Sequence, residues 1–159
     1  MSQDARFEDG AESALHLKAF DADSVAVISA LIQDAIFPIT EIKWEPKARR
    51  LSLLLNRFRW EDRALAERQQ RPYERVRSVL AIGDVTGVAS QGINRQERDT
   101  VLSLLSVGWE PGDDGTGRIV LTLAGDGAIR ADVECVDLTL RDVTKPYAAP
   151  SRKVPGHPE

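Results

Sequence analysis

Residues 51–60, Leu-Ser-Leu-Leu-Leu-Asn-Arg-Phe-Arg-Trp, constrain the fold more than any other stretch of the chain. The segment begins as the most apolar run of the sequence and ends in a cluster of arginine and aromatic side chains. In a β-strand, alternate side chains share a face. One face then carries Leu51, Leu53 and Leu55, and the other carries Leu54, Phe58 and Trp60. Because both faces begin apolar, we predict a strand covered by a helix on one side and by further sheet on the other.

One helix is predicted, and it begins at Asp21. Asp21 is a good N-cap, and Asp23 adds negative charge to the first turn, where the unpaired N–H groups favour it. An apolar stripe at helical spacing follows, until Pro38 disfavours helical geometry in the residue before it. The stripe consists of Val25, Ile28, Leu31, Ile32, Ala35 and Ile36. We interpret this stripe as the face that packs against a sheet, with a partner-binding face as the alternative.

The other apolar runs predict strands. Residues 39–44 lie close enough to residues 50–60 to form a hairpin with them. The best hairpin signal is Gly125-Asp126-Gly127, because Asp-Gly tolerates the positive backbone angles of a tight turn. We also expect a bulge near Cys135. Further strands are predicted within residues 15–20, 74–93, 101–109, 119–124 and 128–135, and an exposed loop or marginal helical turn over residues 61–71.

Together these elements predict one α+β domain over residues 15–144. We expect one N-terminal helix packed on a strongly curved antiparallel sheet, or incomplete barrel, of about seven strands. A chain of 159 residues can bury enough surface to need no metal or disulfide for stability. Residues 1–14 are predicted to be flexible and the proline-rich residues 145–159 to be disordered, because neither segment has much to bury.

An internal similarity accompanies this arrangement. Ile-Lys-Trp-Glu-Pro at residues 42–46 resembles Val-Gly-Trp-Glu-Pro at residues 107–111, and each precedes a polar turn and an apolar strand. A duplicated hairpin around Trp44 and Trp109 would explain the similarity, and so would chance reuse of one strand-ending pattern.

Composition favours a cytoplasmic location. No stretch approaches the roughly 18 apolar residues that span a bilayer, so we expect no membrane association. The polar, acidic N-terminus lacks an apolar segment of the secretory type, and a single cysteine, Cys135, excludes an internal disulfide framework.

The charge is unevenly distributed. Residues 43–77 hold 11 Lys/Arg against 5 Asp/Glu, whereas the whole chain has a net charge of −4. This profile differs from the strongly basic one of a general nucleic-acid binder, so nucleic acid is not the expected partner. The segment is either an anion-binding face or a set of solvated strand faces that are rich in arginine.

The residues for common catalytic chemistry are scarce. The only histidines are His16 and His157, and residues 87–92 have one residue too many before Ser90 for a nucleophile elbow. No phosphate-binding glycine motif is present, so we expect no cofactor. We predict that Cys135 is a small buried hydrophobe, and we expect no metal site because no histidine or cysteine clusters with it.

The remaining candidate for recognition is Asn56, Arg57, Arg59 and Trp60, with the nearby residues Arg49, Arg50, Arg75 and Arg77. Guanidinium groups bind carboxylates and phosphates through paired hydrogen bonds, and an aromatic neighbour can stack on a base. The alternative is structural. In that interpretation the arginines pair with Glu61, Asp62 or Glu74, and Trp60 caps the edge of the core.

The order of several short segments resembles an uncharacterised bacterial protein family known only as domain of unknown function 2948. The segments lie between about residue 15 and residue 142. They are Val27-Ile28-Ser29-Ala30 with Gln33-Asp34-Ala35, Leu55-Asn56-Arg57-Phe58 with Trp60, Val101-Leu102-Ser103-Leu104-Leu105, and Ala128-Ile129-Arg130 with Val133-Glu134-Cys135. The resemblance implies no activity, cofactor or catalytic residue.

The leading functional prediction is a small cytosolic binding module that acts through the face around Arg57 and Trp60. Its ligand would be an acidic partner protein or a phosphorylated molecule, with a second copy of the chain as another partner. One alternative is an enzyme without a cofactor that uses carboxylates such as Asp34, Asp132 or Glu134, which would require a pocket containing at least two of them. The other alternative is a weak binder of single-stranded nucleic acid, which would require a continuous basic groove.

Overall fold

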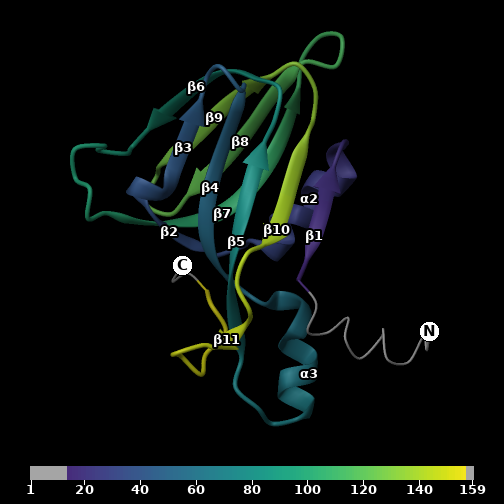
Figure 1. Cartoon of the computed structure of the whole chain (residues 1–159), viewed down its shortest axis with the longest axis vertical. Helices are drawn as coiled ribbons and strands as arrows, with labels where there is room; N and C mark the ends of the chain where they lie inside the picture. Colours follow the sequence, from purple (N-terminus) through teal and green to yellow (C-terminus); the bar gives the residue numbers. More distant parts are fainter. Residues whose placement is uncertain (1–13, 157–159) are drawn as a thin grey trace.

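The long apolar strand lies in the middle of the sheet. The computed structural model describes residues 14–156, and in it β4 (Arg50–Phe58) lies between β5 (Glu74–Ile82) and the short β2 (Ile36–Pro38) (Figure 1). The predicted hairpin with the preceding segment is confirmed, because β3 (Ile42–Glu45) also pairs with β4. A 3-10 turn, η1 (Ile39–Glu41), replaces the first half of the predicted strand 39–44.

All strand pairs in the described part of the chain are antiparallel and belong to one sheet. The order along it is β1-β10-β5-β4-β2-β7-β8-β9-β6, with β3 paired to β4 and β11 paired to β5. The remaining strands are β1 (His16–Ala19), β6 (Val85–Gln91), β7 (Val101–Pro111), β8 (Gly117–Leu123), β9 (Ala128–Val133), β10 (Leu138–Asp142) and β11 (Tyr147–Ala148).

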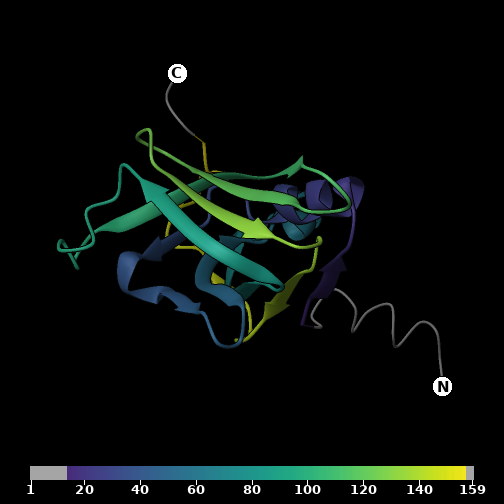
Figure 2. The ribbon, with the colours of Figure 1, turned by 90° about the horizontal axis from the view of Figure 1, so that it is seen from above.

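The sheet curves so that its two parts face each other without closing. Figure 2 shows β6 to β9 on one side of the molecule and β3 and β4 on the other. The core fills the space between them, and it includes Leu53 and Leu55 from β4 and Leu121 from β8. The predicted curved, incompletely closed antiparallel sheet is thus confirmed in outline. The predicted numbers are wrong, because the sheet has 11 strands and the described residues form two α-helices.

Helix α2 (Ala22–Leu31) begins where the sequence predicts and ends earlier. The side chain of Asp21 accepts a hydrogen bond from the backbone N of Ser24 at 2.8 Å, and the hydroxyl of Ser24 accepts one from the backbone N of Asp21, which completes a capping box. Val25 and Ile28 are buried, and the helix contacts β1 and β7. The predicted continuation to residue 36 is wrong, because the chain turns at Asp34, where φ is 63°, and then pairs as β2.

A second helix occupies the polar segment after β4. The 3-10 turn η2 (Trp60–Asp62) leads into α3 (Arg63–Arg68), in which Ala66 is buried. The helical alternative for residues 61–71 is the correct one. The helix has only six residues and buries one of them, so the sequence contains only a weak helical pattern of apolar residues.

The C-terminal half contains the best-predicted hairpin. Strands β8 and β9 pair across Gly125 and Asp126, whose φ angles are 80° and 69°. The predicted bulge near Cys135 is wrong, because β9 ends at Val133 and the chain crosses to the other part of the sheet before β10 begins. The crossing exposes Cys135, which we had predicted to be buried.

Part of the proline-rich tail pairs with the sheet. Strand β11 pairs with Arg75 and Glu74 of β5, and the backbone N of Ala149 donates to the carbonyl of Tyr73 at 2.7 Å. Main-chain pairing to an open strand edge needs no apolar side chain, so Tyr147 and Ala148 join the sheet although the tail has little to bury, and disorder from residue 145 stays a prediction. Residues 157–159 and almost all of the predicted flexible N-terminus lie outside the described residues.

The two tryptophan segments occupy different positions. Trp44 lies in the four-residue β3 and Trp109 in the eleven-residue β7, and each strand forms a hairpin with the next one. A duplication of this unit stays a prediction.

No helix within residues 14–156 is long and apolar enough to cross a membrane.

Candidate functional site

Arg57 lies inside the protein. Side chains alternate along β4, so the face that carries Leu51, Leu53 and Leu55 also carries Arg57. The side chain of Arg57 has no exposed surface. This placement excludes Arg57 from direct contact with a ligand in solution.

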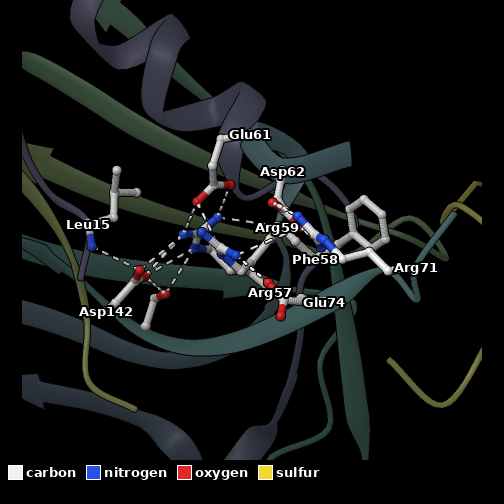
Figure 3. Close-up of polar contacts among 10 residues, drawn as sticks. Leu15, Arg57, Phe58, Arg59, Glu61, Asp62, Arg71, Glu74 and Asp142 are labelled. Carbon is white, nitrogen blue, oxygen red and sulfur yellow. Dashed lines mark hydrogen bonds and ion pairs between the residues drawn. The ribbon is translucent and has the colours of Figure 1, made fainter. Parts of the chain in front are cut away.

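Three acceptor side chains surround the guanidinium group (Figure 3). Both terminal nitrogens of Arg57 donate to the carboxylate of Glu61 at 2.8 Å, and Nη2 also donates to Asp142 at 3.1 Å. Nε donates to the hydroxyl of Ser78 at 3.0 Å. Asp142 also accepts bonds from Ser78 at 2.6 Å and from the backbone N of Leu15 at 2.9 Å. The network thus joins β4, β5 and β10 to the chain just before β1.

The charges of this network stabilise one another. Burial by itself lowers the pKa of Arg57, but the hydrogen bonds and negative charges of Glu61 and Asp142 outweigh it and raise the pKa above its ordinary value. Arg57 therefore stays charged. An added anion would have to displace a carboxylate that already makes two hydrogen bonds of 2.8 Å to Arg57.

Arg59 lies in an adjoining ion-pair network (Figure 3). Its side chain is 5% exposed, and it pairs with Glu74 and lies 3.8 Å from Asp62. Asp62 in turn accepts two hydrogen bonds of 2.7 Å from Arg71. The bonds from Arg71 hold the pKa of Asp62 below its ordinary value, although burial opposes this shift.

Asn56 and Trp60 complete the predicted group. Asn56 Oδ1 accepts a hydrogen bond of 2.6 Å from Nε of Arg75. Trp60 Nε1 donates to the carbonyl of Gln33 at 2.9 Å, and its ring meets that of Phe58 edge-on at 4.7 Å. All four predicted residues therefore have partners within the chain. The geometry matches the structural alternative, in which the arginines pair with Glu61, Asp62 and Glu74.

The carboxylates proposed for an enzyme lie apart. Asp34 is buried in the turn between α2 and β2 and lines a pocket of about 350 Å³. Asp132 lies on β9 and forms an ion pair of 3.2 Å with Arg118, whereas Glu134 pairs with Arg49. The pocket beside Asp34 contains neither of the other two carboxylates.

A different cavity lies where the sheet fails to close. It has a volume of about 500 Å³ and is bounded by η1, β3 and β4 on one side and by β6 and β9 on the other. Its apolar lining consists of Ile39, Ile42, Trp44, Leu51, Val88, Ile93 and Ile129. We call this cavity the mouth pocket. Its size is that of a site for a small organic ligand or one large side chain.

Two arginines line the same pocket. Arg95 and Arg98 belong to the loop between β6 and β7, and both are exposed. Arg95 Nη2 lies 3.5 Å from the hydroxyl of Ser90. Among residues 14–156, no carboxylate forms an ion pair with either arginine. Within the described chain, the pocket thus combines apolar walls with two cations that have no paired carboxylate.

The loop that carries these arginines is held by its own hydrogen bonds. The side chain of Asn94 accepts from the backbone N of Gln96 at 3.0 Å, and the carbonyl of Glu97 accepts from the backbone N of Thr100 at 3.1 Å. The backbone N of Ile39 then donates to the carbonyl of Thr100 at 2.9 Å. No element or site is predicted from the sequence for residues 94–100. The sequence does place an apolar residue, Ile93, close to two arginines, and this combination is the signal from which the pocket could be predicted.

Comparison with known proteins places the chain in a family. The model of the family described as "Protein of unknown function (DUF2948)" matches residues 15–157. The chain belongs to this family. The resemblance predicted from the order of short segments is confirmed, and the family's description assigns no activity. Neither the curated proteins nor the solved structures gave a match.

Proposed function

We propose that this member of DUF2948 is a small cytosolic binding module whose ligand site is the mouth pocket. The ligand carries an apolar group, which enters the pocket, and an anionic group, which pairs with Arg95 and Arg98. This proposal keeps the acidic ligand expected from the sequence and moves its site away from Arg57. The observation that carries it is the pairing of an apolar pocket of about 500 Å³ with two exposed arginines to which no carboxylate within residues 14–156 forms an ion pair.

The apolar walls provide the binding free energy. Trp44 and Val88 are half-buried and line the pocket from opposite sides, so a ligand between them would remove apolar surface from water. Each square ångström of apolar surface removed contributes about 25 cal/mol. Each buried methylene group contributes about 0.8 kcal/mol, from which the cost of immobilising the ligand is subtracted.

The arginines provide the selectivity for charge. Guanidinium groups form paired hydrogen bonds with carboxylates and phosphates, and Arg95 and Arg98 need break no internal ion pair to do so. Arg57 and Arg59 would have to give up Glu61, Asp142 or Glu74 first. The mouth pocket is therefore the better anion site of the two.

Calorimetric titration with three ten-carbon probes tests the proposal. Decanoate should bind, decanol should bind at least tenfold more weakly, and decyltrimethylammonium should not bind measurably. The variant Val88→Phe should abolish decanoate binding because the added ring occupies the pocket. Val120→Phe, on the half-buried outer side of β8, is the matched control.

The arginines have their own control. Arg95→Ala combined with Arg98→Ala should weaken decanoate binding at least tenfold, whereas Arg68→Ala combined with Arg141→Ala removes the same charge from exposed positions outside the pocket lining and should change nothing. Equal affinity for decanoate and decanol, or binding that survives Val88→Phe, would contradict the proposal.

A further inference from the structure

Strand β6 ends the sheet with an open edge. It pairs with β9 on one side, and no other strand of the described chain pairs with it on the other. At its first residue, the backbone N of Val85 donates to the carbonyl of Arg49 at 2.9 Å. Beyond Val85, no backbone hydrogen bond joins β6 to β3 within residues 14–156. The main-chain groups along the rest of this edge are therefore open for pairing.

The edge of β6 lacks the usual protection against pairing. Proteins protect open edges with charged side chains, proline or very short strands. Strand β6 reads Val-Thr-Gly-Val-Ala-Ser-Gln, seven residues without a charge or a proline, with its register shift confined to the beginning. The other open edges are protected, since β1 and β3 have four residues each and carry Lys18 and Lys43.

The mouth pocket lies directly behind this edge. Val88 and Ser90 of β6 line the pocket, as do Ile42 and Trp44 of β3 across the opening. A strand added to β6 would place every second side chain toward the pocket. Recognition of an extended peptide uses this combination, in which main-chain bonds give affinity and a pocket for alternate side chains gives specificity.

We propose that the ligand of the mouth pocket is an extended, acidic segment of a partner protein that adds to β6 as a further strand. One bulky apolar side chain of the segment fills the pocket, and its carboxylates pair with Arg95 and Arg98. This inference rests on the proposed function, whose pocket the segment fills. The open edge favours a peptide over a free amphipathic molecule, which would leave the main-chain groups of β6 unused.

A blocked peptide Glu-Thr-Glu-Thr-Phe-Ser-Val-Ser-Val, in which both glutamates share the face of the phenylalanine, tests the inference. Hydrogen exchange of the full chain, resolved by NMR, should show slower exchange for alternate amides of β6 when the peptide is bound. Decanoate should fill the pocket without slowing these amides. A peptide with lysine in place of both glutamates should bind at least tenfold more weakly.

Two N-methylated peptides provide the matched control. Successive N–H groups of a strand point to opposite edges, so methylation at both threonines blocks one edge, and methylation at both valines blocks the other. One of the two peptides should bind roughly tenfold more weakly than the parent, and the other should keep its affinity, because each main-chain hydrogen bond contributes about 0.5–1.5 kcal/mol.

The outcomes separate this inference from the proposed function. Decanoate binding without peptide binding would overturn the strand addition and leave the mouth pocket as a small-molecule site. Failure of both ligands would overturn both proposals. If the protection of the β6 amides from exchange increases with protein concentration in the absence of peptide, the strand partner is a second copy of the chain. This result would also overturn the inference.

Discussion

Two pairs of arginines in this chain have opposite surroundings. Arg57 and Arg59 are buried on and just after β4 and pair with Glu61, Asp142 and Glu74, whereas Arg95 and Arg98 are exposed on a loop with no carboxylate paired to them in the described chain. The first pair lies in the most conspicuous segment of the sequence, and the second in an inconspicuous one. A concentration of arginine and aromatic residues thus indicates a structural network as readily as a binding site.

Among the four arginines compared, replacement of Arg57 should have the largest effect on stability. Arg57→Ala should lower the free energy of unfolding by about 3–5 kcal/mol, because it leaves Asp142 buried without its cation. Urea denaturation at neutral pH measures the loss. Arg141→Ala, an exposed arginine on β10, is the control and should change the stability little. A small effect of Arg57→Ala would mean that the network is not structural.

Asp62 should make the stability sensitive to acid. Because its folded pKa lies below the unfolded value, its contribution is complete above about pH 4 and is lost as the pH falls through the folded pKa. Asp62→Asn should cost about 2 kcal/mol at pH 7, since it weakens the charged hydrogen bonds to Arg71. Thermal melts should also show a smaller loss of Tm between about pH 5 and pH 2 than in the unchanged protein. Asp114→Asn, in an exposed turn, should preserve the original pH profile.

Glu61 should contribute less than Arg57 because it is partly exposed. Its side chain retains 29% of its surface, and Arg57 keeps Asp142 and Ser78 when the charge of Glu61 is removed. Glu61→Gln should therefore cost about 1 kcal/mol in urea denaturation. A loss as large as that of Arg57→Ala would show that Glu61, and not Asp142, is the essential counter-ion.

Arg95 and Arg98 should have the smallest effect on stability. Replacement of both by alanine should change the free energy of unfolding by less than about 0.5 kcal/mol, because exposed residues without an ion-pair partner contribute little. The same variant should bind decanoate at least tenfold more weakly. A clearly larger loss would show that the two arginines support the fold.

The sequence predicts the parts of the fold that depend on local patterns. The leucines of β4, the capping residue Asp21 and the Asp126-Gly127 turn all appear where expected. The inward position of Arg57 could also be predicted, because Arg57 follows the same alternation along β4 as Leu53 and Leu55. The predicted binding face around Arg57 rests on the residue type and not on this alternation.

Other features depend on contacts between distant segments. Helix α2 ends early because Asp34 turns the chain and β2 pairs with β4 and β7. Tyr147 and Ala148 of the tail pair with the sheet because β5 offers them an edge. The mouth pocket exists only because β3 and β6, about 40 residues apart, face each other without pairing. No local sequence pattern shows which distant segments will meet in the fold.

The buried network around Asp142 also has a consequence for folding kinetics. Its bonds join residues separated by 64, 85 and 127 positions in the chain, so they form only after β10 has reached β5 and β4. Contacts between such distant residues form late in folding because loop closure costs entropy first. Weakening this network should therefore speed unfolding more than it slows folding, and stopped-flow measurements on Arg57→Ala would show the change mainly in the unfolding arm. The network would then act chiefly to keep the folded protein from opening.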